Sequence, residues 1–285
     1  MKGAMITVGA DPEFFIGNAR GRPVPICGLL GGTKDKPYRE PRWPRGYAVQ
    51  EDNVMAEYNV PAATDSMAFA ESIQTGRQFV METLFAAGHT PYQALSGCAF
   101  EFDGMELMTP QAKMFGCSAD FDGHEMGVPL ARIVPDVLRT ASGEWRFAGG
   151  HVHVGYRKAF TFEMPEFVGA SMCDLFLSLP LIAQMRDVQG ERRKFYGTPG
   201  RYRPTPYGLE YRTLGNGWTF SSRYAHDVAD RVFRTFGILA RNEDMVRRIY
   251  NEMPWVAVRE AINSEDVGMA ADLHARASTF LKAGE

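Results

Sequence analysis

The chain has 285 residues, of which 45% are hydrophobic and 23% charged, a composition that predicts a water-soluble globular protein with a substantial core. No apolar run approaches the roughly 20 residues that span a bilayer, and residues 1–15 lack the features of a signal peptide, so we expect a cytoplasmic protein without a membrane partner. The net charge of −3 gives no overall case for nucleic-acid binding, and the four widely spaced cysteines favour reduced thiols over disulfides or a structural zinc site.

Strands and loops are predicted to dominate the first half of the chain. The patterns indicate strands over residues 4–17, 47–60 and 92–104, the first of which is bent at residues 9–12. Residues 18–47, rich in Gly, Pro and Arg, are predicted to form a long loop. Residues 64–88 carry apolar side chains at helical spacing, begin at a capping Asp65 or Ser66 and end at Gly88, which predicts a helix. A short helix is expected within residues 127–141.

The second half is predicted to hold two further strands and then mostly helices. Residues 147–157 and 207–218 have strand character, and residues 163–187 predict a buried apolar helix that bends near Pro180. Helical patterns dominate from residue 221 onward. This order predicts an α+β fold, with an antiparallel sheet, helices packed on one side of it and a helical C-terminus. Since no linker or repeat is found, we expect one domain over residues 1–285, with 221–285 as its helical C-terminal part.

Four of the predicted strands carry polar side chains on one alternating face. These are Asp11 and Glu13 in "GADPEFF", Glu51, Asn53, Glu57 and Asn59 in "QEDNVMAEYN", His151 and His153 in "GGHVHVG", and Glu210 and Arg212 in "GLEYRTL". For any one strand, an exposed sheet face explains such a pattern. If the four faces meet in one concave sheet, the carboxylates would repel one another unless cations lay among them. Mg²⁺ or Mn²⁺, with oxygen ligands and an occasional histidine nitrogen, fits this composition.

A basic segment lies between Arg186 and Arg212, with seven cations against three anions, whereas the remainder of the chain sums to about −7. It predicts either a solvated face or an anion site. Carboxylates, a histidine and an arginine cluster together are typical of phosphoryl transfer from a nucleotide. Because the sequence has no GxxxxGK[ST] loop, no HExxH and no GxSxG, this chemistry would have to come from the carboxylate-lined sheet.

At these strands the chain resembles the glutamine synthetase and glutamate–cysteine ligase superfamily. The closer resemblance is to the compact amidoligase branch of phages and bacteria, the phage-type COOH–NH2 ligases. The resemblance covers residues 9–218 and rests on five blocks in family order: "GADPEFF", "QEDNVMAEYNVP", "FGCSADFD", "GGHVHVG" and "RRKFYGTPGRYRPTPYGLEYRTLGNGW". If the protein is encoded by a phage, its expected location is the host cytoplasm.

The resemblance implies roles for individual residues. Glu13, Glu57 and Glu210 match glutamates that hold catalytic divalent ions, with Asp11 and Glu51 as auxiliary or second-layer ligands. His151 matches a metal-binding histidine, and His153 matches its neighbour, which contacts nucleotide or substrate. Arg203 and Arg212 match arginines that face the γ-phosphate and the acyl phosphate. Weaker nucleotide-binding matches are Arg193, Lys194 and Tyr196, and the chemistry assigns no role to Cys117 or Asp120.

The implied fold is a half-barrel sheet with its active site in the concave face. The implied reaction is an ATP- and Mg²⁺- or Mn²⁺-dependent ligation, in which a carboxylate is activated as an acyl phosphate and an amine then forms the amide. The chain lacks the separate N-terminal domain of glutamine synthetase, which argues against an obligate ring oligomer. The acid and the amine stay open, with amino acids, peptides, polyamines or a modified nucleobase as partners. A guanidino-kinase-like phosphotransferase and a non-catalytic protein that binds nucleic acid or another polyanion are the alternatives.

Overall fold

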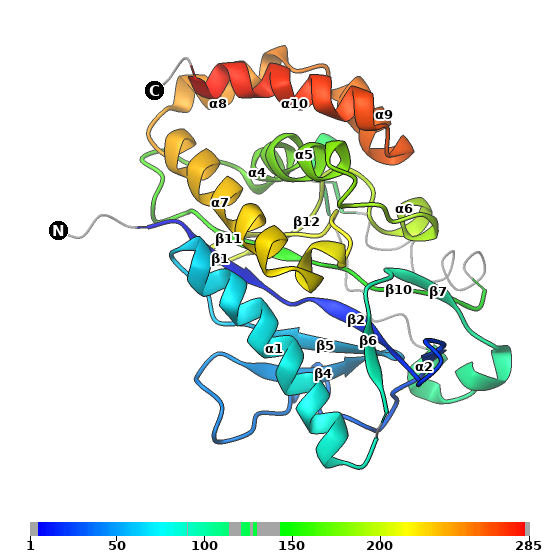
Figure 1. Cartoon of the computed structure of the whole chain (residues 1–285). Coiled ribbons are helices and arrows are strands. Elements are labelled where there is room, and N and C mark those ends of the chain that lie inside the picture. Colours follow the sequence, from blue (N-terminus) through cyan, green and yellow to red (C-terminus); the bar gives the residue numbers. More distant parts are fainter. Residues whose placement is uncertain (1–4, 90, 114–120, 126–127, 130–142, 283–285) are drawn as a thin grey trace.

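The computed structural model describes residues 5–89, 91–113, 121–125, 128–129 and 143–282 (Figure 1). Cys117, Asp120 and residues 130–141 of the predicted short helix lie outside these ranges. Val128 and Pro129, which the sequence placed at the start of that helix, form a short strand instead.

Six antiparallel strands form the larger sheet, in the order β1-β11-β13-β12-β8-β9. Their bounds are β1 (Thr7–Ala10), β11 (Val152–Gly155), β13 (Gly208–Tyr211), β12 (Arg201–Thr205), β8 (Phe121–Asp122) and β9 (Val128–Pro129). The register sets Gly9 opposite His153, His153 opposite Glu210 and Glu210 opposite Arg203. Cross-strand partners point to the same face, so these positions form one row across the sheet.

A second antiparallel sheet continues from the first through a bent strand. It has the order β3-β2-β5-β4, with β6 also paired to β2, and its strands are β3 (Pro23–Val24), β2 (Glu13–Gly17), β5 (Met55–Asn59), β4 (Ala48–Asp52) and β6 (Gln93–Leu95). Only Asp11 and Pro12 separate β1 from β2. Residues 58–60, at the end of β5, run alongside this junction, since Tyr58 N donates to Pro12 O (3.2 Å) and Val60 N to Ala10 O (3.2 Å). The predicted bend at residues 9–12 is therefore confirmed. A separate pair is formed by β7 (Ala99–Glu101) and β10 (Trp145–Phe147).

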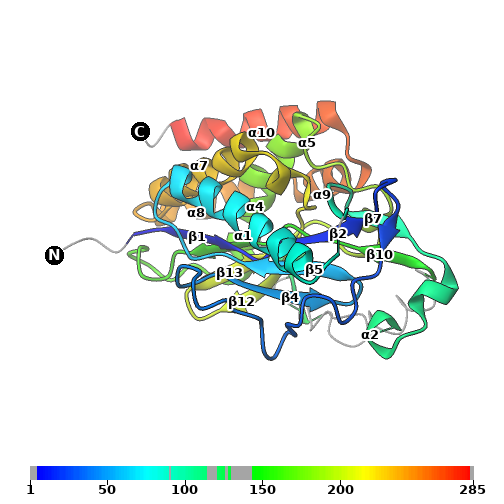
Figure 2. The ribbon, with the colours of Figure 1, turned by 60° about the horizontal axis from the view of Figure 1, so that its bottom comes forward.

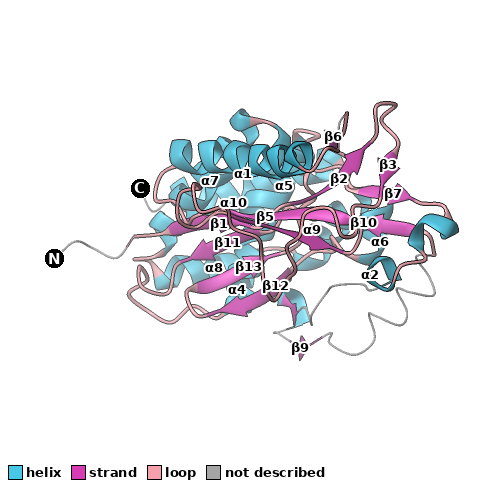
Figure 3. Ribbon diagram, turned by 90° about the horizontal axis from the view of Figure 1, so that it is seen from below, coloured by secondary structure: helices cyan, strands magenta, loops and turns pink. Residues whose placement is uncertain are grey.

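The main helices of the described residues lie on one face of the sheets (Figures 2 and 3). The main helices are α1 (Ser66–Ala86), α4 (Glu166–Cys173), α5 (Leu179–Ala183), α7 (Ser222–Leu239), α8 (Glu243–Glu252), α9 (Trp255–Ser264) and α10 (Val267–Lys282). Helix α1 packs on β4 and β5, α7 on β1, and α4 on β12 and β13. Two short helices, α2 (Pro110–Lys113) and α6 (Glu191–Phe195), complete the elements used below.

The alternation of side chains along the strands explains this arrangement. Val8, Val154 and Leu209 are completely buried in the core shared with the helices. Their neighbours in sequence point to the opposite face, as strand geometry requires. The polar half of each strand is therefore gathered on the opposite face, where the residues that the structure describes form no helix layer.

Helix α1 forms as the sequence predicts. Asp65 is its N-cap and accepts a hydrogen bond from Ala68 N, and Gly88, with a φ of 86°, follows its end. The predicted apolar helix at 163–187 is interrupted by a π-helical segment, Asp174–Ser178, that precedes Pro180. Residues Glu166–Ala183 have the length and composition of a membrane span, but 83% of this window is buried inside the protein, as in a core helix.

Helices packed with antiparallel sheet and a helical C-terminus are thus confirmed, whereas closure into a half-barrel stays a prediction because the sheets are open. Two strand predictions were wrong. Residues 47–60 form a hairpin of β4 and β5, and residues 92–104 supply β6 and β7 to different sheets. In both cases a turn lies inside a stretch whose alternation looks continuous in sequence.

Candidate active site

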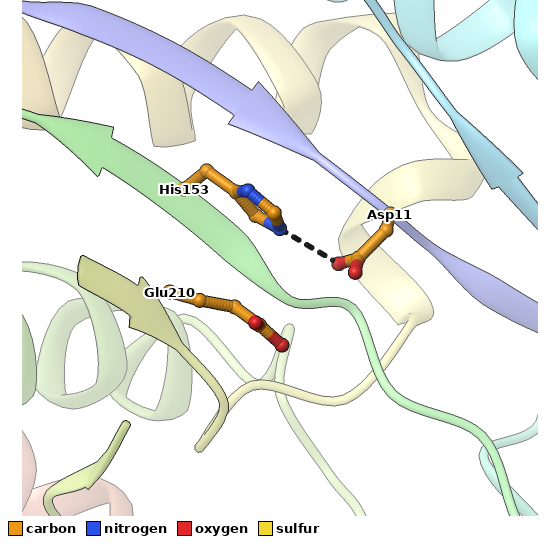
Figure 4. A group of neighbouring side chains, drawn as sticks. All are labelled: Asp11, His153 and Glu210. Carbon is orange, nitrogen blue, oxygen red and sulfur yellow. Dashed lines mark ion pairs between the residues drawn. The ribbon is translucent and has the colours of Figure 1, made fainter. Parts of the chain in front are cut away.

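Three strands bring a histidine and two carboxylates together on the helix-free face (Figure 4). Asp11 follows β1, His153 lies on β11 and Glu210 on β13, and one potential ligand atom from each lies within 4.8 Å of those of the other two. His153 Nε2 is 3.1 Å from Asp11 Oδ1. We call these residues the Asp11 group. It contains one nitrogen and two carboxylate ligands, all from neighbouring strands of a single sheet.

Three carboxylates form a second group beside it. Glu13 on β2 and Glu57 on β5 are direct cross-strand partners, and Asp52 at the end of β4 lies on the same face. Their carboxylate oxygens also lie within 4.8 Å of one another. We call these residues the Glu13 group. Asp11 and Glu13 are two residues apart, so the rise of an extended chain separates their Cα atoms by roughly 6–7 Å and sets the two groups side by side.

Two arginines and His151 surround Glu210. Arg203 Nη1 lies 3.1 Å from Glu210 Oε2, and Arg212 Nη1 pairs with the other carboxylate oxygen. Arg212 Nη1 also lies 3.2 Å from His151 Nδ1, which is itself 3.5 Å from Asp11 Oδ1 and 3.6 Å from Glu210 Oε1. Arg212 is buried, whereas the side chain of Arg203 is 25% exposed and borders the open side of the Asp11 group.

The charges around the Asp11 group determine its protonation. Burial works to raise the pKa of Asp11, but His153 and His151 outweigh it and hold that pKa well below its ordinary value. Burial and Asp11 likewise oppose ionisation of Glu210, yet Arg212, His151 and Arg203 lower its pKa overall. Both carboxylates are therefore ionised at neutral pH. For the two histidines, burial and Arg212 lower the pKa of His151, whereas Asp11 outweighs burial and raises that of His153.

The Glu13 group has the opposite balance. Burial, together with the neighbouring Asp52 carboxylate, raises the pKa of Glu13 to about 8, even though Arg212 and a hydrogen bond from Gly149 N oppose this. Burial and the carboxylates of Asp11, Glu13 and Asp52 raise the pKa of Glu57 well above its ordinary value. Buried carboxylates that repel one another in this way favour a bound cation.

The donor atoms of both groups suit divalent ions. The Glu13 group offers oxygen ligands alone, which hard cations such as Mg²⁺ and Mn²⁺ prefer. The Asp11 group adds one imidazole nitrogen to two carboxylates, a mixed set that Mn²⁺ and Mg²⁺ sites also use. The residues present therefore fit the metal that the resemblance implies.

The prediction that Glu51 lies with Glu57 was wrong, and Asp52 takes its place. The hairpin pairs Gln50 with Glu57 and Asp52 with Met55, so Glu51 points to the other face. There its carboxylate accepts hydrogen bonds from backbone N–H groups of the loop at residues 28–31. Because two residues form the turn between β4 and β5, the even-numbered residues Gln50 and Asp52 share a face with the odd-numbered Met55 and Glu57. The Asp52-Asn53 pair, a common turn signal, could have revealed it.

The three weaker predictions from the basic segment contact other residues. Arg193 is buried and pairs with Asp187 and Glu265, and Lys194 pairs with Glu191 at the surface. The ring of Tyr196 packs against Phe147. Because α6 is a helix, successive side chains point about 100° apart and cannot all reach one site.

Arg192, which the sequence did not single out, lies closer to the acidic groups. Its side chain is buried and donates to the backbone oxygen of Arg212, and its positive charge acts on Glu13. A Cβ atom on Gly149 would meet His151 Nε2 at 2.3 Å and Arg192 Nη2 at 2.9 Å, so this glycine admits both side chains. The first glycine of "GGHVHVG" is the sequence signal for this close approach.

The predicted division of roles between the histidines is not the one that the geometry favours. His153 belongs to the Asp11 group through Nε2, whereas His151 Nδ1 faces Arg212 as well as Asp11 and Glu210. Both rings point to the same face, as predicted. Of the two, His153 is the one that groups with Asp11 and Glu210 as a potential metal ligand, whereas Arg212 Nη1 lies 3.2 Å from His151 Nδ1.

A comparison with protein families matches part of the chain. Residues 141–260 match the family model described as Phage phiEco32-like COOH.NH2 ligase-type 2. The match confirms the resemblance to the phage-type branch over this part, which contains both histidines, Arg203, Glu210 and Arg212. Asp11 and the Glu13 group lie before the matched residues. No curated protein matches the chain.

Proposed function

We propose that the protein is an ATP- and divalent-metal-dependent carboxylate–amine ligase that works through an acyl phosphate. One observation carries the proposal: two adjoining groups of potential metal ligands lie on two continuous sheets, and one of the groups includes His153 and Glu210 from the part of the chain that matches a COOH–NH2 ligase family. Such a family implies a carboxylate and an amine as substrates. The use of ATP, the metal and the intermediate are our additions.

The proposed chemistry has two steps. A carboxylate oxygen attacks the γ-phosphorus of ATP, the bond to the β-phosphate oxygen breaks, and ADP leaves. The amine nitrogen then attacks the acyl carbon, the carbon–oxygen bond to phosphate breaks, and the nitrogen loses a proton as the amide forms. Activation is needed because a free carboxylate resists nucleophiles, whereas phosphate is a good leaving group.

The described side chains have distinct parts in this scheme. The Asp11 group and the Glu13 group would each hold a divalent ion, and bound ions of this kind neutralise charge on phosphate oxygens. Arg203, partly exposed beside Glu210, would contact the transferring phosphoryl group. Arg212 keeps Glu210 ionised and in place. The protein would thus act by positioning its substrates and by electrostatic stabilisation.

The test is ADP release across pairs of carboxylates and amines with Mg²⁺ or Mn²⁺. We expect release that requires acid, amine and metal together, and its loss in Glu57→Gln, which removes one carboxylate of the Glu13 group without changing its size. The matched control is Glu71→Gln, because Glu71 is an exposed carboxylate of α1. Wild-type turnover in Glu57→Gln would refute the assignment.

The same assay separates the alternatives. A guanidino-kinase-like enzyme would release ADP with a phosphorylated product and no amide. A polyanion-binding protein would bind DNA or RNA in a salt-sensitive way that survives Glu57→Gln. The second alternative has little support, because Arg192 and Arg193 of the basic segment are buried and hydrogen-bonded.

A further inference from the structure

Tyr207 lies at the tip of the hairpin that joins β12 and β13, next to the Asp11 group. Its backbone oxygen accepts hydrogen bonds from Tyr156 N (3.0 Å) and Arg157 N (3.1 Å), just beyond the end of β11. Gly208 N donates to Thr205 Oγ1 (3.1 Å), which closes the turn. A Cβ atom on Gly208 would lie 2.1 Å from Val154 O, so the hairpin docks closely on β11. The backbone of Tyr207 is therefore fixed relative to His153.

The side chain of Tyr207 turns back over the sheet toward His153. Its hydroxyl oxygen is 2.6 Å from His153 Nδ1, and the two rings lie nearly end to end, with centroids 6.1 Å apart and planes 19° apart. The other ring nitrogen, Nε2, faces Asp11 at 3.1 Å. Each nitrogen of the imidazole thus has one defined neighbour.

We propose that Tyr207 is a positioning residue that sets the tautomer and orientation of His153 for metal binding. An imidazole that ligates a metal through Nε2 must carry its proton on Nδ1, and that N–H group needs an acceptor. The hydroxyl oxygen of Tyr207 is in place to accept this hydrogen bond, which would fix the orientation of the imidazole. This inference rests on the proposed function, because it assigns His153 to an ion of the Asp11 group.

Metal affinity tests the inference without measuring activity. Mn²⁺ binding is followed by the loss of the electron paramagnetic resonance signal of the free ion, for wild type, Tyr207→Phe and Tyr92→Phe. Tyr207→Phe keeps the ring and the turn but removes the hydroxyl, and we expect about 10–100-fold weaker binding at one site. Tyr92 is the matched control, since it stacks on His89 (5.7 Å, 6°) away from both groups. Its loss of a hydroxyl should change nothing.

Two further measurements separate positioning from a general structural effect. In a His153→Gln background, Tyr207→Phe should cause no additional loss of Mn²⁺ affinity. At a Mg²⁺ concentration near the dissociation constant of wild type, the ¹⁵N shifts of His153, identified by their absence in His153→Gln, should show a protonated Nδ1 with Nε2 bound to metal in wild type, and a smaller metal-bound fraction in Tyr207→Phe.

The outcomes distinguish this inference from the function on which it rests. If wild type binds Mn²⁺ and Tyr207→Phe binds it equally well with unchanged ¹⁵N shifts, the role of Tyr207 is refuted and the proposed function stands. If wild type binds no Mn²⁺ or Mg²⁺, with or without ATP, the proposed function is refuted and the inference is refuted with it.

Discussion

Glu13→Gln is expected to make the metal-free protein more stable while abolishing metal-dependent turnover. Glu13 is buried, and its pKa rises from about 4.5 to about 8 because burial and Asp52 disfavour its charge. A glutamine has the same shape and can still accept the hydrogen bond that Gly149 N donates at 2.7 Å. The substitution therefore removes an unfavourable charge and keeps the local geometry.

The magnitude follows from linkage between protonation and folding. Below pH 4.5 the carboxyl group of Glu13 is protonated in both the folded and the unfolded state, so it does not lower the free energy of unfolding. As pH rises toward 8, the unfolded state ionises first, so the folded state loses stability relative to it. Each pKa unit corresponds to about 1.4 kcal/mol, so at pH 7 the charge of Glu13 lowers the free energy of unfolding by at most about 3.5 kcal/mol, and at pH 5 by less than about 1 kcal/mol.

Urea unfolding in a chelator at pH 5 and pH 7 measures this effect. We expect Glu13→Gln to exceed wild type in unfolding free energy at pH 7, by an amount that shrinks at pH 5, while Glu71→Gln behaves as wild type at both. With Mg²⁺ present the order should reverse, because only wild type gains stability from the bound ion. A metal-free Glu13→Gln protein that is no more stable than wild type at pH 7 would show that this carboxylate is not electrostatically destabilised.

Three other substitutions give sharp expectations. Asp52→Asn should weaken Mn²⁺ binding at least tenfold. Glu51→Gln should lower the melting temperature and leave Mn²⁺ binding unchanged, because Glu51 holds the loop at residues 28–31. The reverse result would restore Glu51 as the metal ligand that the sequence predicted. Gly149→Ala should lower the free energy of unfolding by about 1–3 kcal/mol and remove most of the activity, because its Cβ would displace His151 and Arg192. In thermal unfolding, the control Gly237→Ala, in open space on α7, should be neutral or slightly stabilising. Burial lowers the pKa of His274, whose Nδ1 donates to Leu175 O, so the stabilisation by this residue is complete above pH 6.5 and declines as pH falls. In urea unfolding, the free energy of unfolding of His274→Asn should therefore decline less than that of wild type between pH 7 and pH 5. An unchanged slope would contradict this.

Local patterns predicted much of this molecule because side-chain parity and helix caps depend on neighbouring residues. The alternation that placed Asp11 with Glu13 and His151 with His153 on one face is a property of a single strand. Asp65 capped α1 as expected for the same reason. The helix-free polar face followed from such patterns without any knowledge of strand order.

The errors came from turns and from contacts between distant segments. A turn at Asn53, whose φ is 58°, moved Glu51 off the face and brought Asp52 onto it. The position of Arg192 beside Gly149 and the backbone of Arg212 joins three segments that are distant in sequence, which no local pattern encodes. The contact of Tyr207 with His153 likewise joins residues 54 positions apart.

The bend at Asp11 and Pro12 limits which insertions and deletions the protein can tolerate in evolution or engineering. The chain segment from Asp11 to Glu13 contributes one acid to each group, so its covalent geometry, and not the packing of helices, sets how far apart the groups lie. Inserting or deleting one residue there would turn one of the acids toward the core and remove a carboxylate from the group that contains it. Conversely, the helical layer could be redesigned extensively, provided that this three-residue spacer and its pairing with β5 are left intact.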